Sequence, residues 1–296
     1  MSFGVSKNFI QFEDLSSEEL RVFNLILQNI YQKRGIDFCQ YRPKCLRRRI
    51  VVGMHDVNVT SFCTYLDFLN KNPLQYDKLL DRITINVLEF FRNPEAFKAI
   101  RRKVIPSIIE RKEKMASYNI RIWSSGCATG EEPYSLAILF KEALQELGQN
   151  IKVTILATDI DKESLRKANL GVYGEKALKE LTTRQIAAYF VKEEDKYCIK
   201  PQIKVMVNFM THNMISDELP AAIDLILCRN VIIYFNKELQ NKVHANFHAA
   251  FVSTGFLVAG KTESLMDVKE ELFSKIDLGK RILQKRIKRT SGEDNV

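Results

Sequence analysis

A glycine-bounded segment followed by two acids is the first group of residues whose types could do chemistry. Gly126 and Gly130 are the first and last residues of the sequence GCATG, which follows an apolar run at 120–123. Because glycine has no Cβ, such a loop lets a ligand approach the backbone closely. A phosphate site would combine exposed N–H groups with Lys or Arg, whereas Glu131 and Glu132 would repel phosphate. One of these acids could hold an ammonium group; alternatively, both only stabilise the start of a helix.

An acid after the next predicted strand narrows the choice of ligand. Asp159 follows the apolar run at 153–157. An acid at that place in a Rossmann-like unit accepts hydrogen bonds from ribose hydroxyls. Asp161 is a better candidate for the N-cap of a helix that begins at Lys162. The glycine loop, the acidic helix start and Asp159 together favour an adenosine ligand without phosphates. We therefore predict a site for S-adenosylmethionine rather than for NAD or ATP.

Histidine and cysteine form no comparable pattern. His244 and His248 stand four residues apart on a predicted helix, which is a spacing that metal ligands use, but no HExxH motif accompanies them. We expect both to lie on a solvated helix face, and we expect no metal. The six cysteines include no CxxC pair. Cys127 and Cys228 are expected to be small apolar fillers.

From about residue 120 the sequence pattern predicts an α/β fold. Apolar runs of strand length alternate with predicted helices, and these runs are too apolar for a half-exposed sheet. The predicted strands are 120–123, 153–157, 205–209, 224–228, 255–259 and 281–287, and the helices are 131–147, 162–169 and 237–251. This order indicates a Rossmann-like, doubly wound, mostly parallel sheet, which binds ligands beyond the carboxyl ends of its strands. Residues 191–207 carry no helix signal, so a short antiparallel β excursion with a turn at Pro201 is expected there.

The first eighty residues show no β-alternation and predict an all-α N-terminal domain. Ser16 and Glu19 have the spacing of a capping box for a helix that Gly35 ends. Further helices are expected at 43–54, after Thr60 or Ser61, and between Pro73 and Thr84. The expected organisation is a helical domain at 1–82, a linker at 83–100, the ligand-binding domain at 101–290 and a disordered tail at 291–296.

Composition and charge indicate the expected compartment and the kinds of partner that the protein could bind. No stretch approaches the roughly 20 apolar residues that span a bilayer, and the first residues lack a secretory signal, so we expect a cytoplasmic protein. The formal net charge of +9 suits an acidic partner. Nucleic acid, anionic lipid and a carboxylate-rich protein surface all satisfy that condition.

Four motifs together resemble one family. The runs ITINVLEFFRNPEAF (83–97), WSSGCATGEEPYSLA (123–137), ATDID (157–161) and LCRNVIIYF (227–235) are similar to those of the CheR-type chemotaxis-receptor glutamate O-methyltransferases. The resemblance implies methyl transfer from S-adenosylmethionine to glutamate side chains of methyl-accepting chemotaxis receptors, for sensory adaptation. The products would be glutamate methyl esters and S-adenosylhomocysteine. The implied partners are the cytoplasmic methylation helices of the receptors, and we expect a monomer.

The resemblance also implies roles for matched residues. Donor contacts are implied at Asn86, Arg92, Gly126, Glu131, Glu132, Asp159, Asn213, Met214, Arg229 and Asn230. Arg92 and Tyr234 would be the catalytic residues, orienting the incoming carboxylate and the donor. Tyr234 could instead be a packing residue, and Phe90 and Phe91 are expected to be core or pocket wall. Leu88 departs from the family, which usually has Thr or Ser there, so a hydroxyl contact to the donor is absent or replaced.

Substrate recognition is expected in the N-terminal domain. A basic cluster on the second predicted helix would face the acidic receptor; its residues are Arg42, Lys44, Arg47, Arg48 and Arg49. The alternative is a solvated face that only aids solubility. Some family members dock a receptor C-terminal pentapeptide through a Gly-rich loop, but residues 191–207 contain no glycine, so we predict no dependence on that tether.

Two other functions are alternatives to methyl transfer to a receptor. A nucleic-acid methyltransferase suits the charge, but the basic helix and the sheet motifs lack the stacking aromatics that such proteins use. A non-catalytic signalling module would be supported only by Leu88.

Overall fold

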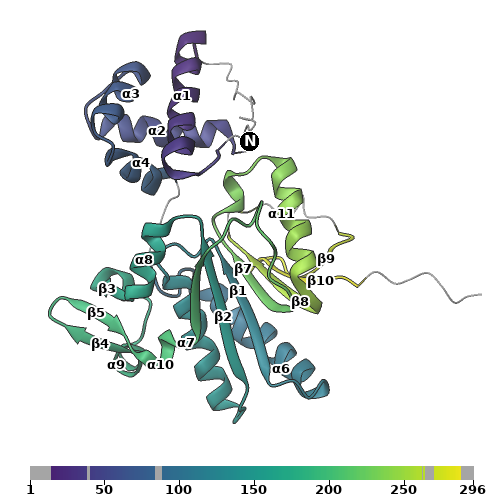
Figure 1. Cartoon of the computed structure of the whole chain (residues 1–296). Helices are drawn as coiled ribbons and strands as arrows, with labels where there is room; N and C mark the ends of the chain where they lie inside the picture. Colours follow the sequence, from purple (N-terminus) through teal and green to yellow (C-terminus); the bar gives the residue numbers. More distant parts are fainter. Residues whose placement is uncertain (1–14, 39–40, 84–88, 262, 264–269, 288–296) are drawn as a thin grey trace, which may run out of the picture. The chain divides into compact units, whose positions relative to one another are not determined.

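The structure, a computed structural model, describes residues 15–38, 41–83, 89–261, 263 and 270–287 (Figure 1). Its contacts divide the chain into two compact units. The first comprises Met1–Asn86 with Tyr234–Leu239, and the second comprises Val87–Ile233 with Gln240–Val296. A short segment from late in the chain therefore belongs with the N-terminal residues.

The described part of the first unit is helical, as predicted. Its helices are α1 (Ser17–Arg34), α2 (Pro43–His55), α3 (Phe62–Lys71) and α4 (Gln75–Ile83). Ser16 Oγ accepts the N–H of Glu19 at 3.2 Å, and the Glu19 carboxylate accepts the N–H of Ser16 at 3.0 Å. This confirms the capping box. Gly35 ends α1 with a left-handed φ of 75°, and Ser61 caps α3 through the N–H of Thr64.

Aromatic packing explains why Tyr234–Leu239 belongs to the first unit. The ring of Tyr41 meets Phe38 and Phe235 edge to face, with centroids 4.8 and 5.0 Å away. Arg42 adds two hydrogen bonds, from its backbone N–H to the carbonyl of Tyr234 at 2.6 Å and from its Nε to the carbonyl of Phe235 at 3.0 Å. Phe235 is buried as a result.

The second unit centres on a seven-stranded sheet in the order β6-β2-β1-β7-β8-β10-β9. Its strands are β1 (Asn119–Ser125), β2 (Lys152–Asp159), β6 (Val207–Thr211), β7 (Ile223–Cys228), β8 (Phe251–Ala259), β9 (Phe273–Asp277) and β10 (Ile282–Lys285). The pairs from β6 to β8 are parallel, whereas β10 pairs antiparallel with β8 and β9. The predicted Rossmann-like, doubly wound, mostly parallel sheet is confirmed. Strand β7 is buried along its whole length, as an interior parallel strand should be.

Helices that pack on this sheet include α6 (Ile105–Lys114) against β1, α7 (Glu131–Glu146) against β2, and α8 (Lys162–Leu170) against β2 and β6 (Figure 1). Residues inside the expected linker form α5 (Pro94–Ala99), which continues through a π-helical turn, η1 (Ile100–Val104), into α6. Helix α11 (Lys237–Ala250) precedes β8. Within the described ranges, no helix is long and apolar enough to cross a membrane.

A small antiparallel sheet confirms the expected excursion and extends it. Its order is β3 (Val172–Gly174), β5 (Lys196–Ile199) and β4 (Phe190–Glu193). The prediction of a turn without helix at Pro201 is wrong, because Pro201–Lys204 forms the one-turn helix α10. Proline presets the helical φ at a first helical position, which favours this turn.

Four further elements differ from the sequence prediction. A 3₁₀ turn, η2 (Glu175–Leu178), and helix α9 (Thr183–Tyr189) precede β4. Strand β9 was not predicted, and β8 begins at Phe251 instead of residue 255. The expected tail at 291–296 lies outside the described residues.

Candidate functional site

The loop after β1 is held by the neighbouring strand. The N–H groups of Gly126 and Cys127 both donate to the carbonyl of Thr158, at 2.8 and 3.0 Å. Gly126 and Gly130 have φ angles of 77° and 95°, in the region that side-chain-bearing residues rarely adopt. The loop therefore lies at the carboxyl end of the parallel strands, where this fold binds ligands.

The two glycines are also required by the packing of the protein itself. A Cβ on Gly126 would collide with the side chain of Val231. A Cβ on Gly130 would lie 2.9 Å from the Cβ of Ala168 and 3.0 Å from the hydroxyl of Tyr173. The loop thus has no room for a side chain at either end, with or without a ligand.

The two acids at the start of α7 have different surroundings. Glu131 is 5% exposed, and its carboxylate accepts the hydroxyl of Thr129 at 2.7 Å. Burial raises the pKa of Glu131, and the Thr129 hydroxyl opposes that shift. Glu131 is therefore bound within its own turn.

Glu132 belongs to a network that spans distant parts of the sequence. Its carboxylate accepts the hydroxyl of Ser124 at 3.1 Å and Nη1 of Arg229 at 3.3 Å. Nη2 of Arg229 donates to the carbonyl of Arg92 at 2.8 Å, and the guanidinium lies 5.5 Å from the ring centroid of Phe97. Burial raises the pKa of Glu132, and the positive charge of Arg229 is the largest opposing influence.

Asp159 joins the glycine loop to the end of β2. Its carboxylate accepts the N–H of Ala128 at 2.8 Å and the N–H of Asp161 at 3.0 Å. Burial raises the pKa of Asp159, and these two N–H groups oppose the shift. Asp161 accepts the N–H of Glu163 at 2.9 Å, which confirms its prediction as the N-cap of α8.

Asn213 and Met214 follow β6. Met214 is buried, and its sulfur accepts the hydroxyl of Ser125 at 3.7 Å, next to the glycine loop. Asn246 of α11 donates to the carbonyl of Met214 at 3.1 Å. The side-chain oxygen of Asn213 accepts the N–H of Ile215, which makes a local turn. Met214 is therefore fixed beside the end of β1.

The turn after β7 involves an acid that the sequence analysis missed. Asn230 has a φ of 64°, and the carboxylate of Glu263 accepts the N–H groups of Val231 at 3.3 Å and Gly260 at 2.7 Å. Glu263 is 4% exposed. Gly260 directly follows the predicted strand, and Glu263 is an acid three residues after it. This spacing was the sequence signal that could have identified Glu263.

The carboxyl ends of the parallel strands form an acidic edge at Glu132, Asp159 and Arg229. This acidic edge fits a cationic ligand that carries hydroxyl groups. Glu131 and Asp159 hydrogen-bond to residues of the glycine loop, and Glu132 accepts the hydroxyl of Ser124 just before it. The buried Arg229 pairs with Glu132. A carboxylate has about four acceptor positions, so Glu132 and Asp159 keep capacity beyond the bonds described. The Nε of Arg229 is buried without a hydrogen-bond partner in the described residues. These residues suit an ammonium group and ribose hydroxyls, and they offer no phosphate cradle.

Other predicted site residues lie elsewhere. Asn86 and Leu88 fall outside the described residues. Tyr234 belongs to the first unit, where it ends the 3₁₀ turn η3 (Ile232–Tyr234) and its carbonyl accepts the N–H of Arg42. Phe90 and Phe91 are buried core, as are Cys127 and Cys228.

The basic cluster does not share one helix face. Successive residues of an α-helix turn by about 100°, so Arg47, Arg48 and Arg49 point in three directions. Lys44 and Arg48 are exposed and stand four residues apart, which places them on one face of α2. Arg42, the N-cap of α2, also bonds the carbonyl of Phe235. Within the cluster, Lys44 and Arg48 are therefore the two exposed residues of the helix itself that share a face.

The prediction that His244 lies on a solvated face is wrong. His244 is 5% exposed, on the side of α11 that also buries Val243 and Phe247. His248 is half-buried, and its ring hydrogen-bonds the carbonyl of Arg286. Helix α11 packs more of its circumference than its polar residues suggest.

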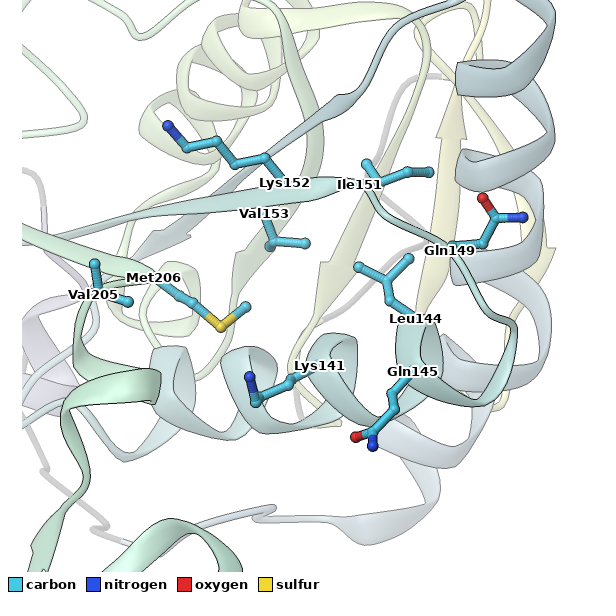
Figure 2. A pocket seen from close by; sticks show the side chains of 9 residues that line it. All are labelled: Lys141, Leu144, Gln145, Gln149, Ile151, Lys152, Val153, Val205 and Met206. Atoms are coloured by element: carbon cyan, nitrogen blue, oxygen red, sulfur yellow. The ribbon is translucent and has the colours of Figure 1, made fainter.

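A surface hollow of about 370 Å³ lies at the other end of the sheet (Figure 2). Lys152 and Val153 of β2, Leu144 of α7, and Val205 and Met206 before β6 line it. These are the amino ends of the parallel strands. The hollow is therefore separate from the acidic edge.

The family models and the relatives that match this chain point to the same family. Two family models match, the CheR methyltransferase all-alpha domain at residues 21–84 and the CheR methyltransferase SAM binding domain at residues 86–282. The "Chemotaxis protein methyltransferase" of Borreliella burgdorferi is 31% identical over 81% of this chain and 87% of its own length. That of Escherichia coli is 30% identical over 82% of this chain and 84% of its own length.

One further relative is much longer than this chain. An uncharacterised 104.1 kDa protein of Rhodobacter capsulatus is 31% identical over 93% of this chain, which spans 28% of that protein. The matched models together cover both the helical and the α/β parts. This chain belongs to the CheR methyltransferase family and carries its S-adenosylmethionine-binding methyltransferase domain.

Proposed function

We propose that this protein transfers the methyl group of S-adenosylmethionine to glutamate side chains of chemotaxis receptors, forming glutamate methyl esters. The observation that carries the proposal is the acidic edge at Glu132, Asp159 and Arg229, which suits a cationic nucleoside donor. Relatives named chemotaxis protein methyltransferase, matched over more than four fifths of this chain, support the receptor as acceptor.

The donor contacts follow from the chemistry of the edge. Glu132 would hold the ammonium of the methionine part, because its side chain keeps 19% exposure, whereas Glu131 is buried and bound within its own turn by Thr129. Asp159 would accept the ribose hydroxyls. Met214 and Asn213, which follow the next strand, would contact the adenine.

The remaining donor assignments rest on the family resemblance. Gly126 would let the donor approach the backbone. Arg229 and Asn230 would complete the edge from the turn after β7, and Asn86 and Arg92 would close over the donor.

The acceptor requires no general base. A glutamate carboxylate has a pKa of about 4.3, so it is already a nucleophile at neutral pH. Its oxygen forms a bond to the methyl carbon as the carbon–sulfur bond breaks, and the sulfur keeps the electron pair. Because this step cancels two opposite charges, alignment and a dry site supply most of the rate. Arg92 and Tyr234 would orient the reacting groups.

Receptor recognition is assigned to α2. Lys44 and Arg48 share an exposed face, and Arg47, Arg49 and Arg42 extend the positive charge around it. This sign of charge suits the acidic methylation helices of receptors.

We further propose that recognition does not depend on a receptor C-terminal pentapeptide. The turn between β4 and β5 is Glu194-Asp195, without glycine. Calorimetry with the isolated pentapeptide should show no binding. Tight binding would contradict this part of the proposal.

A direct assay tests the activity. The protein is incubated with methyl-labelled donor and receptor signalling fragments, and the label is then tested for release by mild base. Base-labile methyl esters on glutamate are expected. Label that stays on the protein after base treatment, or label on added RNA, would contradict glutamate methylation.

A further inference from the structure

The carboxylate of Glu263 joins the ends of two neighbouring parallel strands. It accepts the N–H of Gly260, after β8, at 2.7 Å and the N–H of Val231, after β7, at 3.3 Å. The backbone N–H of Asn230 also hydrogen-bonds to it. Strands β7 and β8 pair directly, with Cys228 opposite Ala259. One buried side chain therefore organises the backbone of both turns.

The turn that Glu263 holds is tightly packed. Asn230 has a φ of 64°, in the left-handed region that most non-glycine residues avoid and that asparagine adopts more readily than most. A Cβ on Gly260 would lie 2.8 Å from the backbone nitrogen of Asn230, so the two turns touch. Three hydrogen bonds to one carboxylate supply the necessary restraint.

The same turn carries Arg229. This residue immediately precedes Asn230, and its guanidinium reaches Glu132 and the carbonyl of Arg92. Its direction depends on the backbone that follows it, because a rotation of that turn would move the guanidinium away from Glu132.

We infer that Glu263 is a positioning residue for the donor site: it fixes the turn that aims Arg229 at Glu132, and it contributes to donor binding without contacting the donor. This inference rests on the proposed donor site. Glu263 lies outside the four sequence motifs that resemble the family.

The hydrogen bonds that Glu263 accepts require its ionised form. A protonated carboxyl becomes a donor at one oxygen and can no longer accept three N–H groups equally well. Burial raises the pKa of Glu263 to about 7, while its backbone hydrogen bonds and the positive charge of Arg229 oppose the shift. The thiol of Cys228, on β7, also lies within its electrostatic reach. Donor binding should therefore weaken as the pH falls through about 7.

The test measures the binding of S-adenosylhomocysteine by calorimetry between pH 6 and pH 8.5. Glu263→Gln should bind it about ten-fold more weakly than the wild type at pH 8, because the neutral amide leaves a backbone N–H without its charged acceptor. The wild type should lose affinity below pH 7, and the variant should lose less. Glu146→Gln is the control, because it removes an exposed acid at the far end of α7 and should match the wild type.

A purely structural role would lower the melting temperature of Glu263→Gln but leave the affinity and its pH profile unchanged, and that result would overturn the inference. If Glu263→Gln does not fold, Glu263→Asp replaces it; its charge is kept but its reach is shorter, so weaker binding is again expected and wild-type affinity would count against the inference. If the wild type itself does not bind S-adenosylhomocysteine, the donor site fails and this inference fails with it.

Discussion

At the residue scale, the backbone carbonyl and the charged side chain of Arg92 make separate contributions. Its carbonyl holds Arg229, and its positive charge is the smallest of the influences that oppose the rise in the pKa of Glu132 caused by burial. Arg92→Ala keeps the carbonyl and removes only the charged side chain. We expect turnover to fall by about a hundred-fold, in the range for loss of a group that aligns reactants. Single-turnover assays with receptor fragments measure this. Full turnover with unchanged donor affinity would show that the side chain has no part in catalysis.

Asp159 and Asp161 stand two residues apart and provide a matched pair. Asp161→Ala removes the N-cap of α8 and should lower the free energy of unfolding by about 1 kcal/mol, with donor affinity unchanged. Asp159→Ala removes the proposed acceptor for the ribose and the bond to Ala128, so donor affinity should fall by about ten-fold or more. Urea unfolding and calorimetry with S-adenosylhomocysteine separate the two effects. Equal losses of affinity would contradict the assignment.

Glu263 also makes stability depend on pH. Its pKa is raised from 4.5 to about 7, so the folded protein binds a proton that the unfolded chain has released. The contribution is therefore favourable to folding at low pH and is lost as the pH rises from about 4.5 to 7. It amounts to about 3 kcal/mol. Urea unfolding at a series of pH values should show a shallower fall for Glu263→Gln than for the wild type. Parallel curves would contradict the assigned pKa.

At the scale of elements, two glycines with left-handed backbones make a controlled comparison. In Gly130→Ala the new Cβ would lie 2.9 Å from the Cβ of Ala168. In Gly148→Ala the new Cβ would have no atom of a non-neighbouring described residue within 4 Å. Both substitutions carry the cost of a positive φ, of order 1 kcal/mol. Gly130→Ala should add a packing cost of about 1–3 kcal/mol and disturb the donor loop. Thermal unfolding measures the difference, and equal losses would show that the loop can relax.

Local signals predicted those elements whose causes are local. The Ser16–Glu19 capping box, Gly35 and the Asp161 cap each act within a few residues, so the sequence was sufficient to place α1 and the start of α8. Among the described residues, strand β9 is an edge strand that pairs with β10 alone, and it is partly exposed, so it lacks a continuous apolar run. Helix α9 has seven residues and buries little, although its Thr182–Gln185 capping box was readable.

At the scale of the whole molecule, charge predicts how receptor binding responds to salt. The net charge is +9, and exposed Lys44 and Arg48 lie on one face of α2. Reversing both to Glu should raise the KM for receptor fragments about ten-fold at low salt, with donor affinity unchanged. The effect should shrink in high salt, because the screening length falls from about 10 Å at 0.1 M to about 3 Å at 1 M.

The matched control for this experiment reverses Lys98 and Lys114, which are exposed on α5 and α6 and change the net charge equally. It should leave the KM close to that of the wild type. Equal effects of the two double variants would mean that only the net charge matters, which would contradict recognition through α2.

The sequence by itself determined the fold class and the edge of the sheet that carries the candidate site. Alternating strands and helices specify a parallel sheet, and residues that follow such strands must meet at one edge, so Gly126 and Asp159 could be placed together. The tertiary structure alone decided which acid faces Arg229, because that pair is 97 residues apart in the sequence. It likewise decided the burial of His244 and the hydrogen bonds of Glu263. These outcomes depend on which distant segments pack together, and no local pattern encodes that pairing.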